Sequence, residues 1–506
     1  MAKTPSSRQQ KVEHLDTVIV GAGLSGIGAG HYVQAECPWA SYAIFEARDA
    51  IGGTWDLFRY PGVRSDSDMF TLGYSFRPWD SAQAIADGSW ILQYIKDTAA
   101  AEGIDGHIRF RHRIVAADWS TDDACWHVTA ERTDTREIVE LTAGFLFSCS
   151  GYYRYDHGYT PDFPGTERFR GTIVHPQAWP EDLDYAGKRV VVIGSGATAV
   201  TLVPPLADKA GHVTMLQRSP SYIVSVPGKD PVADLLRRTL PRGKSDTAVR
   251  WFKALLTQGV YQLSRRRPEL VKRLLKAGQR RQLPKGYDVD THFTPTYGPW
   301  DQRLCAVPDG DLFKAISAGT ASIVTDRITT FTETGVLLES GAELEADIVV
   351  TATGLELLFL GGIELSVDGD PVDVSTKLTY KGMMLEDVPN LAIAVGYTNA
   401  SWTLKCDLTC QYVSRLLNHM HRTGLRQCTP VNHDTALERQ PLLGLTSGYV
   451  QRSVHKFPKQ GSRFPWQVHQ SYLRDYRALK RSSIHDDAMV FPNTLPAEEP
   501  VAAAAS

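Results

Sequence analysis

A glycine-rich turn near the start of the chain has the spacing that binds the pyrophosphate of a dinucleotide. Gly21, Gly23 and Gly26 follow the apolar run at 17–20. In such turns the first glycine permits a tight bend, the second lets the backbone approach the pyrophosphate, and the third lets a helix pack against the strand. Glu46 ends the next predicted strand. A carboxylate there accepts hydrogen bonds from ribose hydroxyls and repels a 2′-phosphate, so this turn is predicted to bind FAD or NAD.

A second turn of the same kind lies in the middle of the chain, after the apolar run at 189–193. Here the next predicted strand ends in a cation and a hydroxyl, Arg218 and Ser219, instead of a carboxylate. A cation at this place favours the 2′-phosphate of NADP. The residues predicted to bind NADP are Gly194, Gly196, Thr198, Ala199, Arg218 and Ser219.

The two turns predict the fold class. Each is expected to join a buried parallel strand to a helix, which gives an α/β fold with two Rossmann-like dinucleotide-binding domains, one for FAD and one for NADP. Two apolar segments that end in small residues, 145–151 and 348–354, look like crossings between these domains. The predicted limits are 1–150 with 350–490 for a discontinuous FAD domain, 151–349 for the NADP domain, and 491–506 for a disordered tail.

The α/β pattern is interrupted at about 226–290, where arginines and leucines recur at helical spacing. This predicts a helical subdomain inserted in the NADP domain. A solvated helical face is the plainer interpretation of its charges, and contact with an anionic membrane surface is the alternative.

Composition excludes several classes of protein. The 506 residues are 42% hydrophobic and 22% charged, with a net charge of −3, as in ordinary globular proteins without a general attraction to nucleic acid. No apolar run is long enough to span a membrane, and residues 1–14 lack the apolar core of a secretory signal. Seven cysteines without a CxxC pair favour a reduced, cytoplasmic setting, peripheral at the membrane if the helical insertion binds lipid. The oligomeric state stays open.

One FAD site and one NADP site predict a flavoprotein that takes hydride from NADPH, so the acceptor of its electrons has to be identified. No cysteine pair lies near the first turn, and Cys406 and Cys410 come some 350 residues later. No GxSxG, HExxH or clustered Cys/His pattern predicts a hydrolase or a metal site. The acceptor is then molecular oxygen or a diffusible partner.

Between the two turns lies a segment that resembles a known fingerprint. Phe169, Gly171, His175, Trp179 and Pro180 match the FxGxxxHxxxWP pattern of Baeyer–Villiger monooxygenases, which are class B flavin monooxygenases. The resemblance extends from about residue 16 to about 487. It is greatest to the group of the mycobacterial ethionamide-activating enzyme (EthA), MymA and AlmA-like enzymes, and the segments that carry it are 52–68, 300–305 and 396–402.

The resemblance implies an NADPH- and O2-dependent enzyme that inserts one oxygen atom into hydrophobic ketones, through a C4a-peroxyflavin, to give esters. Arg303 would be the active-site cation and Asp66 the carboxylate that orients it. The residues implied to contact or support FAD, besides the first turn and Glu46, are Gly53, Thr54, Trp55, Asp56 and Asn399.

Other functions remain open beside this one. The same flavin chemistry oxygenates the sulfur or nitrogen of sulfides and thioamides, as in prodrug activation. A role in long-chain alkane or fatty-ketone metabolism is a further alternative, although hydroxylation of an unactivated C–H bond is chemically disfavoured. A flavin-binding reductase with a protein partner belongs to a different class, and oxidation of NADPH without an oxygenated product would identify it.

Overall fold

The computed structural model describes residues 12–492. The predicted tail at 491–506 therefore lies outside the described residues, apart from Phe491 and Pro492. All seven cysteines are buried and none forms a disulfide.

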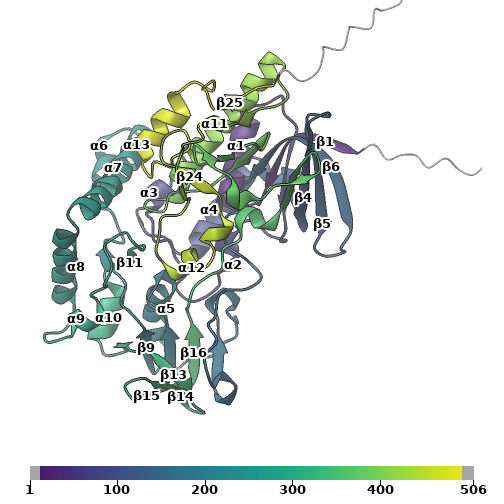
Figure 1. The fold of residues 1–506 in the computed structure, drawn as a ribbon. Helices are drawn as coiled ribbons and strands as arrows, with labels where there is room; N and C mark the ends of the chain where they lie inside the picture. Colours follow the sequence, from purple (N-terminus) through teal and green to yellow (C-terminus); the bar gives the residue numbers. More distant parts are fainter. Residues whose placement is uncertain (1–11, 493–506) are drawn as a thin grey trace, which may run out of the picture.

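The larger sheet is assembled from two distant parts of the chain (Figure 1). Its centre is parallel, with β1 (Glu13–Val20) between β2 (Tyr42–Glu46) and β6 (Ile138–Ser148). One side of α1 (Leu24–Glu36) packs on this sheet and another on α11 (Trp402–Thr423). The remaining strands of the sheet are β3 (Ile108–Phe110), β4 (His112–Ser120), β5 (Cys125–Arg132), β17 (Glu364–Val367), β18 (Asp370–Pro371) and β21 (Leu391–Ile393).

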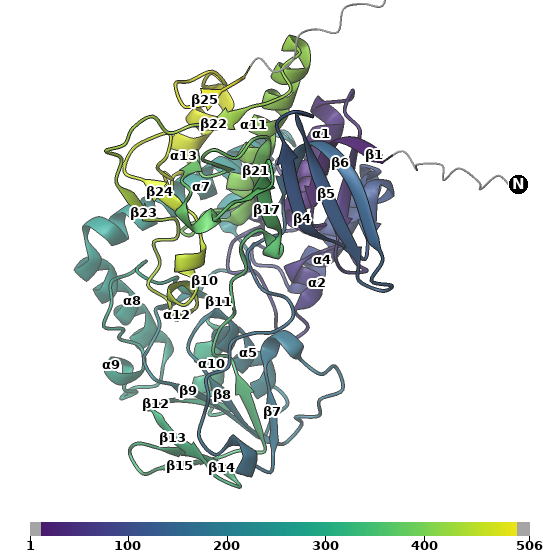
Figure 2. The same cartoon turned by 45° about the vertical axis from the view of Figure 1, so that its right-hand side comes forward.

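The second sheet is wholly parallel and lies in the lower half of Figure 2. Its strand order is β12 (Ala321–Thr325), β9 (His212–Gln217), β8 (Arg189–Ile193), β16 (Ile348–Thr351) and β7 (Thr172–Val174). Because β8 and β16 are buried on both faces, they are continuous apolar runs instead of alternating ones. Next to this sheet lie α5 (Ala197–Ala207), α10 (Asp311–Ser317) and the antiparallel strands β13 (Ile328–Phe331), β14 (Gly335–Leu338) and β15 (Glu343–Glu345).

The predicted α/β fold with two Rossmann-like domains is confirmed by these sheets. Each predicted strand before a glycine-rich turn is a strand, and each turn leads into a helix, α1 or α5. The chain passes between the sheets twice, and the two crossings run antiparallel beside each other. The Arg154 N–H donates to the carbonyl oxygen of Glu356 at 2.9 Å, and the Leu358 N–H donates to that of Tyr152 at 2.9 Å. We propose 1–150 with 350–490 and 151–349 as the domain limits.

The inserted helices lie in the chain between β10 (Ile223–Val226) and β11 (Cys305–Pro308), which pair as a separate two-stranded parallel sheet. They begin where the Asp230 carboxylate accepts hydrogen bonds from the backbone N–H groups of Val232 and Ala233, a side-chain N-cap. Within the described residues, no helix is both long and apolar enough to cross a membrane. The helices are α6 (Pro231–Thr239), α7 (Lys244–Arg266), α8 (Pro268–Gln282) and α9 (Val289–His292).

Short elements complete the fold around the first sheet. The helices are α2 (Thr54–Leu57), α3 (Met69–Leu72), α4 (Gly88–Ala101), α12 (Gly448–Gln451) and α13 (Tyr472–Asp475), followed by a π-helical turn at Tyr476–Arg481. Single turns of 3-10 helix lie at Ile104–His107, Thr166–Arg168, Pro176–Ala178, Phe359–Gly362, Val374–Thr376 and Val454–Lys456. The strand pairs are β19 (Thr379–Tyr380) with β20 (Met384–Leu385), β22 (Thr429–Pro430) with β25 (Met489–Val490), and β23 (Arg439–Pro441) with β24 (Lys459–Gly461).

Candidate active site

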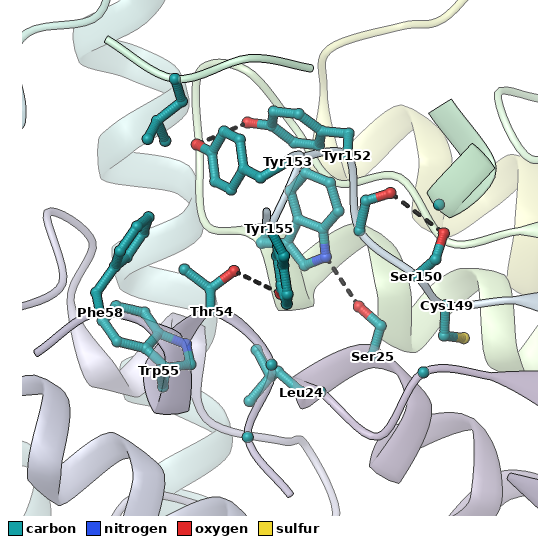
Figure 3. Close-up of a pocket in the computed structure, with 18 of the residues that line it drawn as sticks. Leu24, Ser25, Thr54, Trp55, Phe58, Cys149, Ser150, Tyr152, Tyr153 and Tyr155 are labelled. Carbon is teal, nitrogen blue, oxygen red and sulfur yellow. Dashed lines mark hydrogen bonds between the residues drawn. The ribbon is translucent and has the colours of Figure 1, made fainter. Parts of the chain in front are cut away.

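A cavity of about 560 Å3 lies between the two domains and receives side chains from both. The first glycine-rich turn, the strand end at Glu46 and the first crossing form one part of its wall, shown in part in Figure 3. Thr198, at the start of α5, and Arg303, just before β11, reach it from the second domain. The cavity thus brings together residues that are more than 250 positions apart in the sequence.

The first turn has the shape that a pyrophosphate site requires. A Cβ on Gly26 would lie 1.7 Å from the carbonyl oxygen of Gly21, so only glycine lets α1 pack this close to the turn. Gly23 is the N-cap of α1 and lines the cavity, and a Cβ there would be 3.6 Å from the Cα of Gly53. The free N–H groups at the N-terminus of this 13-residue helix therefore face the cavity, where they suit the phosphates of FAD.

Glu46 is held in the orientation that a ribose needs. Its carboxylate accepts hydrogen bonds from the backbone N–H groups of Ala22, at 2.7 Å, and Arg48, at 2.9 Å. Burial raises the pKa of this carboxyl. A carboxylate has about four lone-pair positions, so two remain for the hydroxyls of the adenosine ribose.

The segment after Gly52 divides into residues that line the cavity and one that does not. Gly53, Thr54 and Trp55 line it, and the Thr54 hydroxyl shares a hydrogen bond of 3.2 Å with the Tyr155 hydroxyl (Figure 3). Asp56 is buried behind them. Its carboxylate pairs with Arg48 at 2.6 Å and with Arg59 at 2.9 Å. Because Arg48 lines the cavity, Asp56 acts on the site through this arginine.

The structure brings Arg303 and Asp66 together. Two nitrogens of the guanidinium donate to the two carboxylate oxygens, at 2.9 Å from Nε and 3.1 Å from the terminal nitrogen. Their side chains are about one-third exposed, 33% and 30%, and both line the cavity. Asp66 raises the pKa of Arg303 above its ordinary value. A permanent cation in a fixed orientation therefore faces the cavity, as a site for a negatively charged oxygen requires.

Sequence reasoning missed a group of tyrosines on the first crossing. The hydroxyls of Tyr152 and Tyr153 are 3.3 Å apart, and the ring of Tyr152 lies 5.1 Å from that of Trp402 (Figure 3). The indole N–H of Trp402 donates to Ser25 on α1 at 2.9 Å, which fixes this part of the wall. The signal was present in the sequence, because three tyrosines, Tyr152, Tyr153 and Tyr155, directly follow the glycine of a predicted crossing.

Among the residues predicted to bind NADP, Thr198 lines the cavity, whereas Gly194, Gly196, Arg218 and Ser219 lie outside its lining. A Cβ on Gly194 would be 2.3 Å from the carbonyl oxygen of Ala352, whereas one on Gly196 would meet no atom within 4 Å. The backbone at Gly196 is therefore open to a ligand. Arg218 and Ser219, at the end of β9, are exposed, and Arg218 makes no ion pair within residues 12–492. The open backbone at Gly196 and the exposed side chains of Arg218 and Ser219 suit the phosphates of NADP. Ala199, in contrast, is buried within α5.

Asn399 is placed differently from the other predicted residues, because it is buried beside the cavity and not in its wall. Its side-chain N–H donates to the carbonyl oxygen of Gln470 at 3.0 Å. Its Oδ1 is buried, and no residue of the described part of the chain donates a hydrogen bond to it. Asn399 therefore supports the start of α11 and the adjoining wall residue Trp402.

Comparisons with known proteins agree with this geometry. The profile of the flavin-binding monooxygenase-like family matches residues 16–366. The chain is 55% identical to the FAD-containing monooxygenase EthA of Mycobacterium tuberculosis over 480 residues, which cover 95% of this chain and 98% of the relative. It is 52% identical to the putative FAD-containing monooxygenase MymA of the same organism, over 95% of this chain and 98% of that one. It is 48% identical to the probable FAD-binding monooxygenase AlmA of Acinetobacter baylyi, over 95% and 96%.

Solved structures share the fold. A steroid monooxygenase bound to NADP superposes with a TM-score of 0.69 at 23% identity, covering 83% of this chain and 88% of that one. The open structure of cyclohexanone monooxygenase gives a TM-score of 0.67 at 21% identity, covering 83% and 90%. OTEMO, in complex with FAD and NADP, gives 0.68 at 22% identity, covering 83% and 88%.

Proposed function

Because this chain belongs to the flavin-binding monooxygenase-like family, we propose that it uses NADPH and O2 to insert one oxygen atom into hydrophobic ketones, giving esters. The enzyme class and the cofactors predicted from the sequence are confirmed: the family and the relatives support a monooxygenase that contains FAD, and the solved structures bound to NADP support the second cofactor. Oxidation of ketones is more specific than this enzyme class, and the residues of the cavity support it.

The Arg303–Asp66 pair is the observation that carries the proposal. Insertion of oxygen beside a carbonyl needs an anionic oxygen to be held next to the substrate, whereas transfer to sulfur proceeds from a neutral oxygen. A guanidinium that cannot lose its proton, fixed by two hydrogen bonds to one carboxylate, suits the anionic case. Arg303 would hold the charged oxygen, and Asp66 would keep the guanidinium turned toward the cavity.

FAD bound in the cavity would supply the redox chemistry by taking hydride from NADPH and activating O2. The first turn would hold its pyrophosphate and Glu46 its ribose. Thr198 lines the same cavity as Thr54 and Trp55, so it would bring NADP to the flavin side of the site. Arg218 and Ser219 would bind the 2′-phosphate.

The aromatic and aliphatic part of the cavity wall favours an apolar substrate. The hydroxyls of Tyr152 and Tyr153 share a hydrogen bond, and both residues line the cavity. Burial raises the pKa of Tyr152. Further apolar side chains in the wall are Phe58, Leu355, Leu358, Leu360 and Trp402.

The test is product analysis. The purified FAD-loaded enzyme is incubated with NADPH, air and a long-chain 2-ketone, and the ester is measured by gas chromatography–mass spectrometry against the NADPH consumed. One mole of ester formed for each mole of NADPH consumed supports the proposal. A sulfide and a thioamide are run in parallel. Oxygenation of these with no ester from any ketone overturns ketone oxidation in favour of sulfur oxygenation, and NADPH loss to an artificial acceptor alone indicates a reductase.

A further inference from the structure

The inserted helices expose an unusual amount of apolar surface. Sixteen large apolar side chains are exposed within the described residues, and ten of them lie between residues 232 and 274. We call these ten the apolar stripe. They are Val232, Leu235, Leu240, Phe252, Leu255, Leu256, Val260, Leu263, Leu270 and Leu274. Concentrated exposure of this kind marks a surface that meets a partner.

On α7 and on α8 the residues of the stripe share one helical face. On α7 the residues Phe252, Leu256, Val260 and Leu263 recur at intervals of three and four, which places them on one helical face. The opposite side of α7 is buried, where Ala254 packs against Tyr397 and Leu404. Leu270 and Leu274 continue the pattern on α8, and α6 and α8 both contact α7. Figure 1 shows these helices, in teal, along one edge of the molecule.

Positive charge is concentrated in the same helices. Residues 229–292 contain 16 lysines and arginines against six aspartates and glutamates, although the whole chain has 54 against 57. Several of these cations are exposed and form no ion pair within residues 12–492. Two of them, Arg266 and Arg273, follow Leu263 and Leu270 by three residues and so adjoin the stripe. The others are Lys229, Arg238, Lys244, Arg267, Arg281 and Lys285.

From this arrangement we propose that α6, α7 and α8 dock the enzyme on an anionic lipid bilayer. The helices lie in the plane of the interface, with the stripe inserted between the headgroups and the flanking cations paired with lipid phosphates. Large aliphatic side chains bordered by unpaired lysine and arginine are the composition that such a surface binds.

The positive charge around the apolar stripe also favours a bilayer over a second copy of this chain as the partner of this surface. In a twofold dimer the same patch faces itself, so the cations around Arg266, Arg267 and Arg273 would face a surface with the same excess of cations. Like charges opposed in this way repel, and no excess of acidic side chains in the insertion compensates them. An anionic surface supplies that compensation.

Co-sedimentation of the FAD-loaded enzyme with vesicles tests the proposal without any turnover, so its outcome is independent of the proposed ketone oxidation. Vesicles of phosphatidylcholine alone are compared with vesicles that also contain phosphatidylglycerol, at low and at high salt. We expect binding to the anionic vesicles, weakened by salt, and little binding to the neutral ones.

Two variants separate the apolar and the charged contributions. Leu255→Glu with Leu263→Glu and Leu274→Glu should lower the partition coefficient at least about tenfold, and so should Arg266→Glu with Arg267→Glu. The matched controls are Ile138→Glu, whose side chain is 54% exposed on β6, and Lys188→Glu with Arg327→Glu, both exposed on the second domain. The controls should bind like the wild type, and the visible flavin spectrum should be unchanged in all variants.

Equal binding to neutral and anionic vesicles overturns the proposal, as does unchanged binding of both stripe and charge variants. Loss of binding in the controls to the same extent overturns it too, because the effect would then be one of net charge. If the enzyme ignores vesicles but is a dimer that the triple glutamate variant dissociates, the surface belongs to a second copy.

Discussion

The imidazole of His175 joins the two crossings between the domains. Its Nδ1 accepts the backbone N–H of Gln177 at 3.1 Å, which leaves the proton on Nε2, 3.2 Å from the carbonyl oxygen of Gly354. A Cβ on Gly158 would lie 2.0 Å from this ring, so the first crossing passes directly over it. The histidine of the sequence fingerprint therefore holds one crossing by contact and the other by a hydrogen bond.

This arrangement predicts a pH dependence of stability. Burial lowers the pKa of His175 below its ordinary value of 6.5, and protonation of Nδ1 removes the acceptor for Gln177. A lowered pKa means that the contribution of His175 is present above the ordinary pKa and is lost as the pH falls below it. His175→Gln should lower the free energy of unfolding by about 1 kcal/mol at neutral pH, and the difference from wild type should shrink toward pH ~5. Urea unfolding at both pH values measures this, and a pH-independent difference would contradict it.

Arg303→Ala should separate NADPH oxidation from oxygenation. FAD and NADPH contacts are retained, so NADPH is still oxidised, but ester formation should fall at least about 100-fold because no cation remains to hold the negative oxygen. Asp66→Asn keeps the shape but loses the charge that orients the guanidinium, and we expect an intermediate loss of about tenfold. The readout is ester formed per NADPH consumed. Arg327→Ala is the control, and a normal ratio for Arg303→Ala would remove its role.

Arg218→Ala should change the choice between the two nicotinamide cofactors. The exposed guanidinium is predicted to pair with the 2′-phosphate that only NADPH carries, so the KM for NADPH should rise by about 10- to 100-fold. The KM for NADH should stay as it is. Steady-state kinetics with both cofactors measure the ratio, again with Arg327→Ala beside it, and an equal change for both cofactors would refute a 2′-phosphate contact.

Glu46→Gln should weaken the binding of FAD and should also change how the stability of the apoprotein depends on pH. An amide offers one acceptor oxygen, so it cannot accept the N–H groups of both Ala22 and Arg48 and also bind a ribose, and the Kd for FAD should rise at least about tenfold. Because burial raises the pKa of Glu46, the wild-type apoprotein gains stability as the pH falls toward that pKa, and the variant lacks this gain.

Fluorescence titration with FAD and thermal unfolding of the apoprotein at two pH values measure the two effects. The exposed carboxylate Glu140 provides the control variant, Glu140→Gln, which should leave both unchanged. Unaltered FAD affinity in Glu46→Gln would show that this carboxylate does not bind the ribose.

Arg250→Met should be strongly destabilising. Arg250 on α7 pairs with Asp407 on α11 at 2.7 Å, with side chains only 10% and 6% exposed, and burial already raises the pKa of Asp407. Removing the cation leaves an uncompensated buried carboxylate, which costs about 3–5 kcal/mol. Arg250→Met with Asp407→Leu should recover part of the loss. The exposed pair of Arg109 and Glu13 is the comparison, since Arg109→Met should cost less than about 1 kcal/mol in the same urea titration.

Each glycine-rich turn and the strands on either side of it could be predicted from the sequence. This follows from local chemistry, because buried parallel strands are continuous apolar runs and a Cβ on Gly26 would collide with the carbonyl oxygen of Gly21, five residues earlier. In each domain the residue that follows the next strand or ends it, Arg218 or Glu46, could also be identified from its distance along the chain from the glycine-rich turn.

Which side chains meet in the cavity could not be predicted, because it depends on the packing of the two domains. Arg303 and Asp66 are 237 positions apart, and their bidentate contact depends on how the second domain is placed against the first. The same packing places Tyr152 and Tyr153 in the cavity wall. It leaves Asp56 buried behind the wall, where it pairs with Arg48, and Asn399 buried beside the cavity. Periodicity and motifs report the face of an element, but distances between elements come from the packing of whole domains, which no local pattern encodes.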